Sequence, residues 1–121
     1  MDKEQALHQF WSSFGVTAYD ENTVPENATL PRITYNVVTD TIGNTVPMTA
    51  SIWDRSTVWN GVTEISHRIA RRLMRGGYTR GYADGIIWIK PGTPFMQRMS
   101  DPDDSIRRIV VNIEVEYFSE E

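Results

Sequence analysis

The sequence predicts an α+β fold, a twisted, mainly antiparallel four-stranded sheet with one long and one short helix packed on one face. Two observations predict this class. Residues 56–77 carry apolar side chains at helical spacing, and a single amphipathic helix needs a sheet on which to bury its apolar side. Four other stretches have the alternating or short apolar pattern of strands: residues 32–40, 46–55, 86–90 and 106–118.

Length and composition bound the class of protein. With 121 residues, the chain is expected to form one domain over residues 1–121. Cysteine is absent, which excludes disulfides and thiolate metal sites. Twelve Lys and Arg against sixteen Asp and Glu give a net charge of −4, which disfavours a protein that coats nucleic acid. We see neither a secretory signal nor an apolar run of membrane-spanning length, so we expect assembly in the cytoplasm.

The first predicted element is a helix over residues 2–14. Asp2 is its expected cap, and Gln5 stands three residues on, where it completes a capping box. The apolar residues recur at i, i+3, i+4 and i+7, namely Leu7, Phe10, Trp11 and Phe14. Gly15 is the expected helix stop. We then expect a short strand over residues 16–19 and a solvated acidic loop over residues 20–31.

An antiparallel hairpin is predicted next. Residues 32–40 form its first strand, and residues 41–45 form its turn, since Gly43 and Asn44 accept positive φ at low cost. The return strand over residues 46–55 places Val46, Met48, Ala50 and Ile52 on one face. Pro47 lacks a backbone N–H, so we expect the start of this strand at an edge or a bulge.

The long helix is predicted over residues 56–77, with Ser56 as its cap and Gly76 and Gly77 as its stop. Its apolar stripe consists of Val58, Val62, Ile65, Ile69 and Leu73. Gly61 weakens the helix by roughly 1 kcal/mol relative to Ala, so we expect it where the helix approaches the sheet or another chain closely.

The C-terminal third is predicted as connection, strand, loop and strand. A glycine-punctuated connection over residues 78–85 leads to the strand at 86–90. Residues 91–105 are predicted as a long loop. Phe95, Met96 and Met99 lie in it, and we interpret them as packing against this domain or against a partner subunit. The strand at 106–118 is either the central strand of the sheet or a projection beyond it.

Catalytic and metal-binding patterns are weak. Glu64 and His67 form a single E-x-x-H pair, whereas di-iron bundles need two such pairs and further carboxylates, so we interpret it as an intrahelical polar contact. The carboxylates of Asp101, Asp103 and Asp104 lack the spacing of a calcium loop and indicate a solvated turn. With two His and no Cys, candidate nucleophile–base pairs are few. We therefore expect neither an enzyme nor a cofactor.

A basic run marks the second half of the long helix and the residues after it: Arg68, Arg71, Arg72, Arg75 and Arg80. Nucleic-acid contact is one interpretation. The acidic net charge favours a solvated or salt-bridged helix face, or a subunit interface, where arginine is enriched.

The order of elements resembles the tail-terminator (tail-completion, minor tail) proteins of long-tailed bacteriophages. The resemblance rests on that order over most of the chain, on the proline-led strand start LPRITY at residues 30–35, and on the final strand RRIVVNIEVEYF at residues 107–118. Trp53, Trp59 and Trp88 depart from many members of that family.

The resemblance implies a structural virion protein without membrane contact, which assembles in the host cytoplasm. Its subunits form a ring, typically a hexamer, that caps the tail tube, stops tube polymerisation and joins the tail to the head. Its partners are the tail tube protein and a head–tail connector, and DNA passes through the ring without specific binding. Two alternatives stay open, another neck or tube-associated protein and a small nucleic-acid-binding regulatory module. Candidate interface residues are Phe95, Met96, Met99, Arg68, Arg71 and Arg75.

Overall fold

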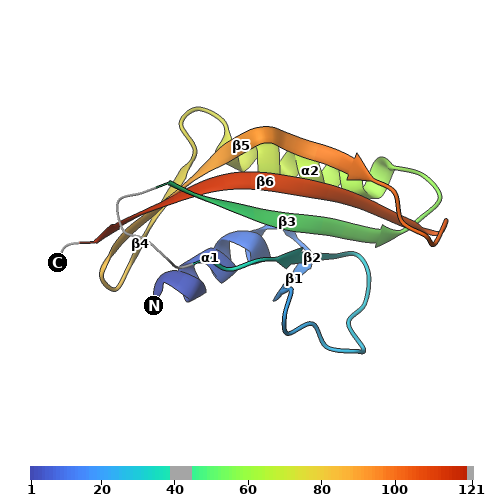
Figure 1. Ribbon diagram of the computed structural model, residues 1–121, viewed down its shortest axis with the longest axis horizontal. Coiled ribbons are helices and arrows are strands. Elements are labelled where there is room, and N and C mark those ends of the chain that lie inside the picture. The colour runs from blue at the N-terminus through green and yellow to red at the C-terminus, as the bar shows by residue number, and fades with distance from the viewer. Residues whose placement is uncertain (39–44, 120–121) are drawn as a thin grey trace.

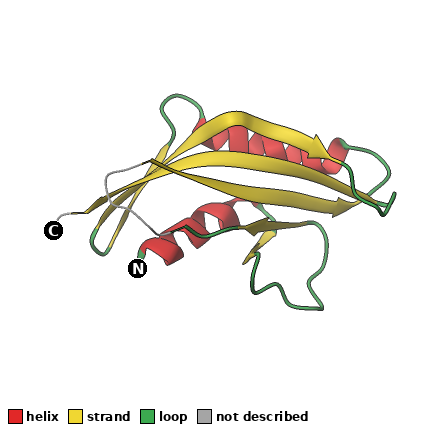
Figure 2. Cartoon of the chain, viewed as in Figure 1, coloured by secondary structure: helices red, strands yellow, loops and turns green. Residues whose placement is uncertain are grey.

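The computed structural model describes residues 1–38 and 45–119 and has the expected α+β architecture (Figures 1 and 2). In chain order the elements are α1 (Lys3–Trp11), the 3-10 turn η1 (Ser12–Phe14), β1 (Thr17–Asp20), β2 (Arg32–Tyr35), β3 (Thr45–Arg55), α2 (Asn60–Leu73), β4 (Tyr78–Tyr82), β5 (Gly85–Met99) and β6 (Ile106–Ser119).

The sheet differs from the predicted one in size and in type. It has six strands in the order β1-β2-β3-β6-β5-β4, and β1 runs parallel to β2 while the other pairs are antiparallel. The prediction of four strands is therefore wrong. The additional strands are β1 and β4. The short strand predicted over residues 16–19 is present as β1, but it joins the sheet as a parallel neighbour of β2, which was not predicted. Strand β4 lies in the predicted connection over residues 78–85 and is too short to show a clear alternation in the sequence.

The predicted long loop at 91–105 is also wrong, because β5 continues through it to Met99. The pairing of β5 with β6 shifts register between Pro91 and Met96, which is a β-bulge in the middle of the strand. Asn112 of β6 holds the bulge, since its Nδ2 donates to the carbonyl of Pro94 at 2.8 Å. Gly92 permits a close backbone approach there, because a Cβ would lie 3.0 Å from the backbone of Asn112.

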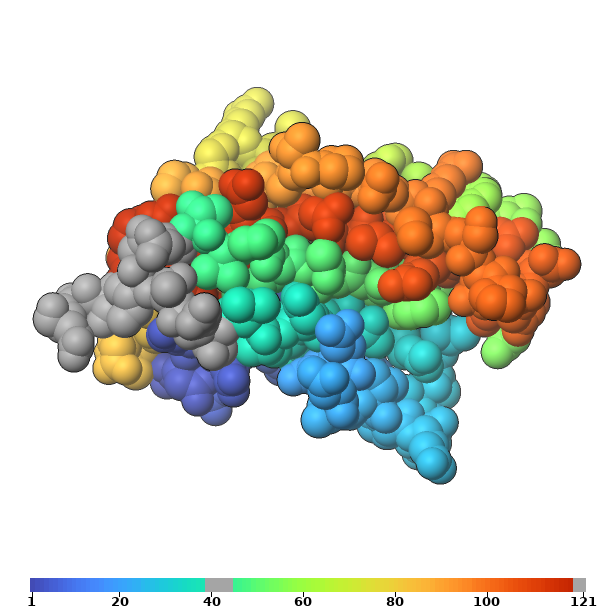
Figure 3. Space-filling view, viewed as in Figure 1, coloured from blue at the N-terminus to red at the C-terminus, as the bar shows by residue number. Residues whose placement is uncertain are grey.

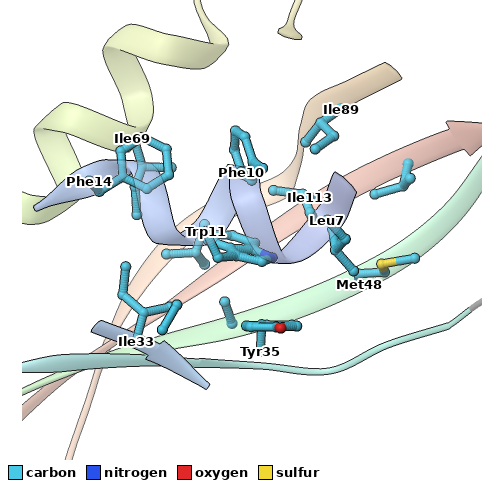
Figure 4. Packing of buried hydrophobic residues seen from close by; sticks show 14 of the residues in the cluster. Leu7, Phe10, Trp11, Phe14, Ile33, Tyr35, Met48, Ile69, Ile89 and Ile113 are labelled. Atoms are coloured by element: carbon cyan, nitrogen blue, oxygen red, sulfur yellow. The ribbon is translucent and has the colours of Figure 1, made fainter. Parts of the chain in front are cut away.

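The core forms on one face of the sheet, and both helices contribute to it (Figure 4). Strand β6 lies at the centre, between β3 and β5, which is one of its two predicted positions. Its inward side chains are buried in a single row, Ile109, Val111, Ile113, Val115 and Tyr117. Full burial of each large apolar side chain contributes roughly 1.5–3 kcal/mol, so this row and the helices that cover it dominate the stability of the fold.

Helix α1 begins as predicted. Asp2 Oδ1 accepts from the backbone N–H of Gln5 at 2.8 Å, and Gln5 Oε1 accepts from the N–H of Asp2 at 2.9 Å. Gly15 follows η1 with a φ of 85°, which confirms it as the stop. The α1 stripe is buried, and the rings of Phe10 and Phe14 meet edge to face with centroids 5.2 Å apart.

Helix α2 begins later than predicted, at Asn60. Ser56 does not cap it, because the Ser56 hydroxyl accepts from the N–H of Val58 at 3.1 Å in a separate turn. Val58 is consequently 54% exposed and lies outside the apolar stripe. The rest of the stripe is buried as predicted: Val62, Ile65, Ile69 and Leu73. Gly61 approaches the sheet as expected, because a Cβ there would lie 2.6 Å from Asp54 Oδ2.

The antiparallel pairing of the predicted hairpin is confirmed, but its first strand, predicted over residues 32–40, ends at Tyr35 and does not continue through residues 36–38. Strands β2 and β3 pair antiparallel from Arg32↔Trp53 to Tyr35↔Ala50. The predicted end of the first strand at 39–40 and most of the turn, residues 41–44, lie outside the described residues. Pro47 pairs with Glu114 of β6 beyond the last β2 partner of β3, so its missing N–H removes no bond of the β2–β3 ladder.

Candidate subunit interfaces

The six interface residues predicted from the sequence fall into two groups at opposite ends of α2. Arg68 and Arg71 lie in the C-terminal half of that helix, and Arg75 follows its end. Phe95, Met96 and Met99 lie on the far half of β5. That half lies near the start of α2, because the guanidinium of Arg98 stands 4.6 Å from the ring centroid of Trp59. The subunit thus separates the two groups.

Three arginines of α2 line an open groove of about 570 Å³, which we name the arginine groove. The residues that line it are Ser13, Phe14, Gly15, Arg68, Arg71 and Arg72. Its other wall is the end of η1, which is more than fifty positions away in sequence. Periodicity along α2 predicted that its arginines share a face. Nothing in the local pattern predicted that η1 would close that face into a groove.

Two of the arginines are held in place by their own chain. Arg68 donates from Nη1 to the carbonyl of Phe14 at 2.9 Å, and its Nη2 lies 3.3 Å from Glu64 Oε1. Arg72 donates to the Ser13 hydroxyl at 3.2 Å, and its guanidinium stands 5.4 Å from the Phe14 ring centroid. Both side chains therefore keep their positive charge at fixed positions along the groove.

The third groove arginine, Arg71, and Arg75, which lies beyond the end of α2 and outside the groove lining, are exposed and have no partner within the described part of the chain. Neither Arg71 nor Arg75 makes a side-chain hydrogen bond or an ion pair there. Arg75 also has a φ of 61°, a left-handed conformation that costs a non-glycine residue energy. Their charges are thus available to an anionic partner.

The apolar group on β5 was interpreted as packing either against this domain or against a partner subunit, and its three residues differ in this respect. Phe95 and Met96 are partly buried against the core cluster of their own chain. Met99, in contrast, is 40% exposed at the end of the strand. Of the three, Met99 offers the most apolar surface to another molecule.

An acidic loop connects β1 to β2 over residues 21–31, with Asp20 at its base, and it projects from the edge of the molecule (Figures 1 and 3). Short turns give it shape: Asp20 Oδ1 accepts from Asn22 N at 3.0 Å, and Pro25 O accepts from Ala28 N at 3.1 Å. Glu21 and Glu26 are exposed. Among the described residues, no ion pair neutralises either of these carboxylates or that of Asp20.

The acidic loop leaves the β1 edge of the sheet, with Asp20 beside Tyr35 on the helix face and Arg32, at its other end, on the outer face. Arg32 Nη1 donates to Ala28 O at 3.2 Å, and Arg32 pairs with Trp53, on the opposite side of the sheet from Ile33 and Ile52. The arginine groove, in contrast, is built from α2 and η1 on the helix face. The acidic loop, at the β1 edge of the sheet, and the arginine groove, between α2 and η1, are therefore two different patches of one subunit.

Trp53, Trp59 and Trp88 each stack with a cation. Trp53 stands 4.5 Å from the guanidinium of Arg108, and Trp88 stands 4.2 Å from Lys90 Nζ. Trp59 lies between Arg98 and Arg107, at 4.6 Å and 5.5 Å. These contacts give the tryptophans a structural role.

A polar chain that the sequence did not predict runs from Ser12 through His8 to Tyr35. Ser12 Oγ lies 3.2 Å from His8 Nε2, and His8 Nδ1 lies 2.7 Å from the Tyr35 hydroxyl. Burial, with smaller effects of the Asp20 and Glu4 carboxylates, raises the pKa of Tyr35 to about 12. Tyr35 therefore stays a neutral hydroxyl and ties α1 to β2. The only sequence signal of this chain was the i, i+4 spacing of His8 and Ser12.

Glu64 and His67 do not form a metal site in this structure, since the Glu64 carboxylate forms an ion pair with Arg68. Within residues 1–38 and 45–119, no cluster of three or more His, Asp or Glu side chains is placed to hold a metal ion. Over the same residues, neither helix has the length and the apolar character that a membrane crossing requires.

No family model matches this sequence, and a search of curated proteins finds no match.

Proposed function

We propose that this chain is a ring-forming structural subunit of a bacteriophage tail, a tail terminator that caps the tail tube and stops its polymerisation. In this role it forms a hexameric ring, which provides the surface that joins the tail to the head. It assembles in the host cytoplasm and then resides in the virion. Its partners are then the tail tube protein and a head–tail connector protein.

One observation carries this proposal beyond the resemblance in element order: a single subunit exposes two unlike charged surfaces, the acidic loop and the arginine groove. A ring needs a heterologous interface, in which two different patches of each subunit meet the complementary patches of its neighbours. Two complementary surfaces that form different patches of one subunit are the arrangement that such an interface requires.

The charge of the chain also supports a channel subunit. The net charge is −4, so a ring of several copies carries a strongly negative total charge. DNA is repelled by a negative lumen and can therefore slide through it without binding. The arginines of the groove do not conflict with this role if a neighbouring subunit covers them.

The proposal is tested by adding the purified chain to the tail tube protein encoded in the same genome. We expect negative-stain electron microscopy to show rings at tube ends and tubes of limited length, with shorter tubes as the ratio of this chain to tube protein rises. A chain that remains monomeric and leaves tube length unchanged would overturn the proposal. Binding to portal or connector complexes in preference to tube ends would instead identify a neck protein.

A nucleic-acid-binding module is separated from a terminator by a second measurement. Its binding to duplex DNA would weaken steeply with salt, because bound arginines release condensed counterions from the phosphates. We expect no such binding at about 0.15 M salt, the ionic strength at which exposed charges are screened beyond about 8 Å.

A further inference from the structure

We propose that in the assembled ring the acidic loop of one copy docks into the arginine groove of the next copy. This inference rests on the proposed function, because it names the contact by which the ring closes. Its occupant is a second copy of this chain, and it is argued from the charge, position and preorganisation of the two surfaces.

Charge complementarity is the first argument. The acidic loop and its base carry three carboxylates, Asp20, Glu21 and Glu26, and no described residue of the same chain forms an ion pair with them. Arg71 in the groove, and Arg75 just beyond the end of α2, are exposed and equally without partners in the described ranges. A carboxylate and a guanidinium form charge-assisted, often bidentate hydrogen bonds, which fix orientation as well as adding affinity.

Position is the second argument. The loop leaves the β1 edge of the sheet, with Asp20 on the helix face and Arg32 on the outer face, whereas the groove lies between α2 and η1. A contact between the two surfaces therefore joins one patch of a subunit to a different patch of the next. Such a contact is heterologous and repeats from copy to copy, as ring closure requires.

Preorganisation is the third argument. The groove is open, about 570 Å³, and its rim includes Gly15 and Ser13, which present little side-chain bulk to an entering loop. Arg68 and Arg72 are already held by Phe14 and Ser13, so their side chains lose little entropy on binding. Turns within the acidic loop, such as that from Pro25 to Ala28, likewise shape the loop before it docks.

Charge reversal tests the contact directly. The groove variant carries Arg71→Glu and Arg75→Glu, and the loop variant carries Glu21→Lys and Glu26→Lys. All four side chains are exposed, so folding should be retained, which thermal melts followed by circular dichroism would check. For each variant alone, we expect the concentration for half-maximal assembly, measured by mass photometry or sedimentation, to rise at least ~10-fold, since 1.4 kcal/mol of lost attraction is tenfold in affinity.

Two combinations sharpen the test. A chain with all four substitutions restores opposite charges across the contact, so its assembly should return to within about threefold of the native chain. An equimolar mixture of the groove variant and the loop variant should likewise assemble, with the two variants alternating, because native loop meets native groove at one contact and reversed loop meets reversed groove at the next. A matched control is the charge reversal Asp84→Lys at an exposed residue of the β4–β5 turn, which should assemble normally.

Each outcome decides between the two proposals. Normal assembly of either charge-reversed variant, or failure of the fourfold variant to recover, overturns the loop–groove contact. If the rings in that case still cap tubes, the proposed terminator function stands. A groove variant that assembles normally and loses binding to duplex DNA identifies the groove as a nucleic-acid site and also overturns the contact. A native chain that never assembles, with or without tubes, overturns both.

Discussion

The backbone carbonyl of Ile89 lies directly against Gly77, at a distance that leaves no room for a Cβ atom. A Cβ on Gly77 would also lie 3.0 Å from Trp88 Nε1, which donates to the carbonyl of Gly76 at 2.7 Å. The turn after α2 is thus clamped to β5 before β4 begins at Tyr78. This clamp places α2, and with it the arginine groove, at a fixed position on the sheet.

Replacing Gly77 with Ala should lower the free energy of unfolding by about 3 kcal/mol, because a left-handed non-glycine residue costs roughly 1–2 kcal/mol and the backbone clash adds to it. Gly76 is the matched control. Its φ is also positive, 98°, but nothing lies within 4 Å of a Cβ there, so Gly76→Ala should cost only about 1 kcal/mol. Urea denaturation measures both, and equal losses would contradict the clamp.

Arg75 is the remaining left-handed residue of the same turn, with a φ of 61°. Arg75→Gly should relieve the steric cost of that conformation, partly offset by the greater freedom of glycine in the unfolded chain. The expected net effect is a stabilisation of about 0.5 kcal/mol. The same substitution at Arg71, inside α2, should instead destabilise the protein by about 1 kcal/mol. Thermal denaturation would show opposite shifts of Tm, and shifts of the same sign would disprove this assignment.

The features that sequence predicted well are those that local physics determines. The capping box of Asp2 and Gln5 depends on residues three apart, and the buried stripe of α2 follows from the period of the helix. The central strand β6 was equally clear, because its alternation continues through the row from Ile109 to Tyr117.

The missed features depend on contacts between distant residues. Pro91, Gly92 and Pro94 have the composition of a loop, yet β5 continues through them because Asn112 of β6 binds the bulge that they form. Helix α2 starts four residues after Ser56, where the indole of Trp59 lies between Arg98 and Arg107 from other strands. No local pattern contains these partners.

The candidate site shows the same division. Helical periodicity predicted that Arg68, Arg71 and Arg75 share a surface, which the structure places along and just beyond one side of α2. The wall at Phe14 and Gly15 comes from the end of η1, which is distant in sequence, so the groove itself could not be predicted. The β5 group was predicted as part of a loop. Its membership of a strand explains why Met96, which pairs with the buried Val111, packs inward while Met99, which pairs with Arg108, is exposed.

Alkaline pH should destabilise the protein. Burial, aided by smaller electrostatic effects, raises the pKa of Tyr35 and of Tyr117 from 10.0 to about 12. Below pH 10 both tyrosines are protonated in the folded and the unfolded chain, so the stability is complete. Between pH 10 and 12 the unfolded chain releases these protons first, and the free energy of unfolding falls by up to about 1.4 kcal/mol per pH unit for each tyrosine. Urea melts at pH 8 to 11.5 would measure the slope.

Phenylalanine substitutions assign that slope to its residues. The Tyr117 hydroxyl is buried without a hydrogen-bond partner among the described residues, so Tyr117→Phe should leave stability at pH 7 unchanged or slightly higher. Tyr35→Phe breaks the 2.7 Å contact with His8 and should cost about 1 kcal/mol at pH 7. Each variant should reduce the alkaline slope by about half, and an unchanged slope in both would show that other groups control it.

Substitutions of Phe95 and Met99 distinguish effects on stability from effects on assembly at the far half of β5. Phe95 is partly buried against the core, so Phe95→Ser should lower the free energy of unfolding by roughly 2 kcal/mol through lost burial. Met99 is 40% exposed, so Met99→Ser should change it by less than about 0.5 kcal/mol. If this end of the subunit also contacts a neighbour or the tube, Met99→Ser should raise the concentration needed for assembly or capping while the melting curve stays unchanged. Unaltered assembly would show that Met99 is not an interface residue, and the contact between the acidic loop and the arginine groove would then be the main subunit interface.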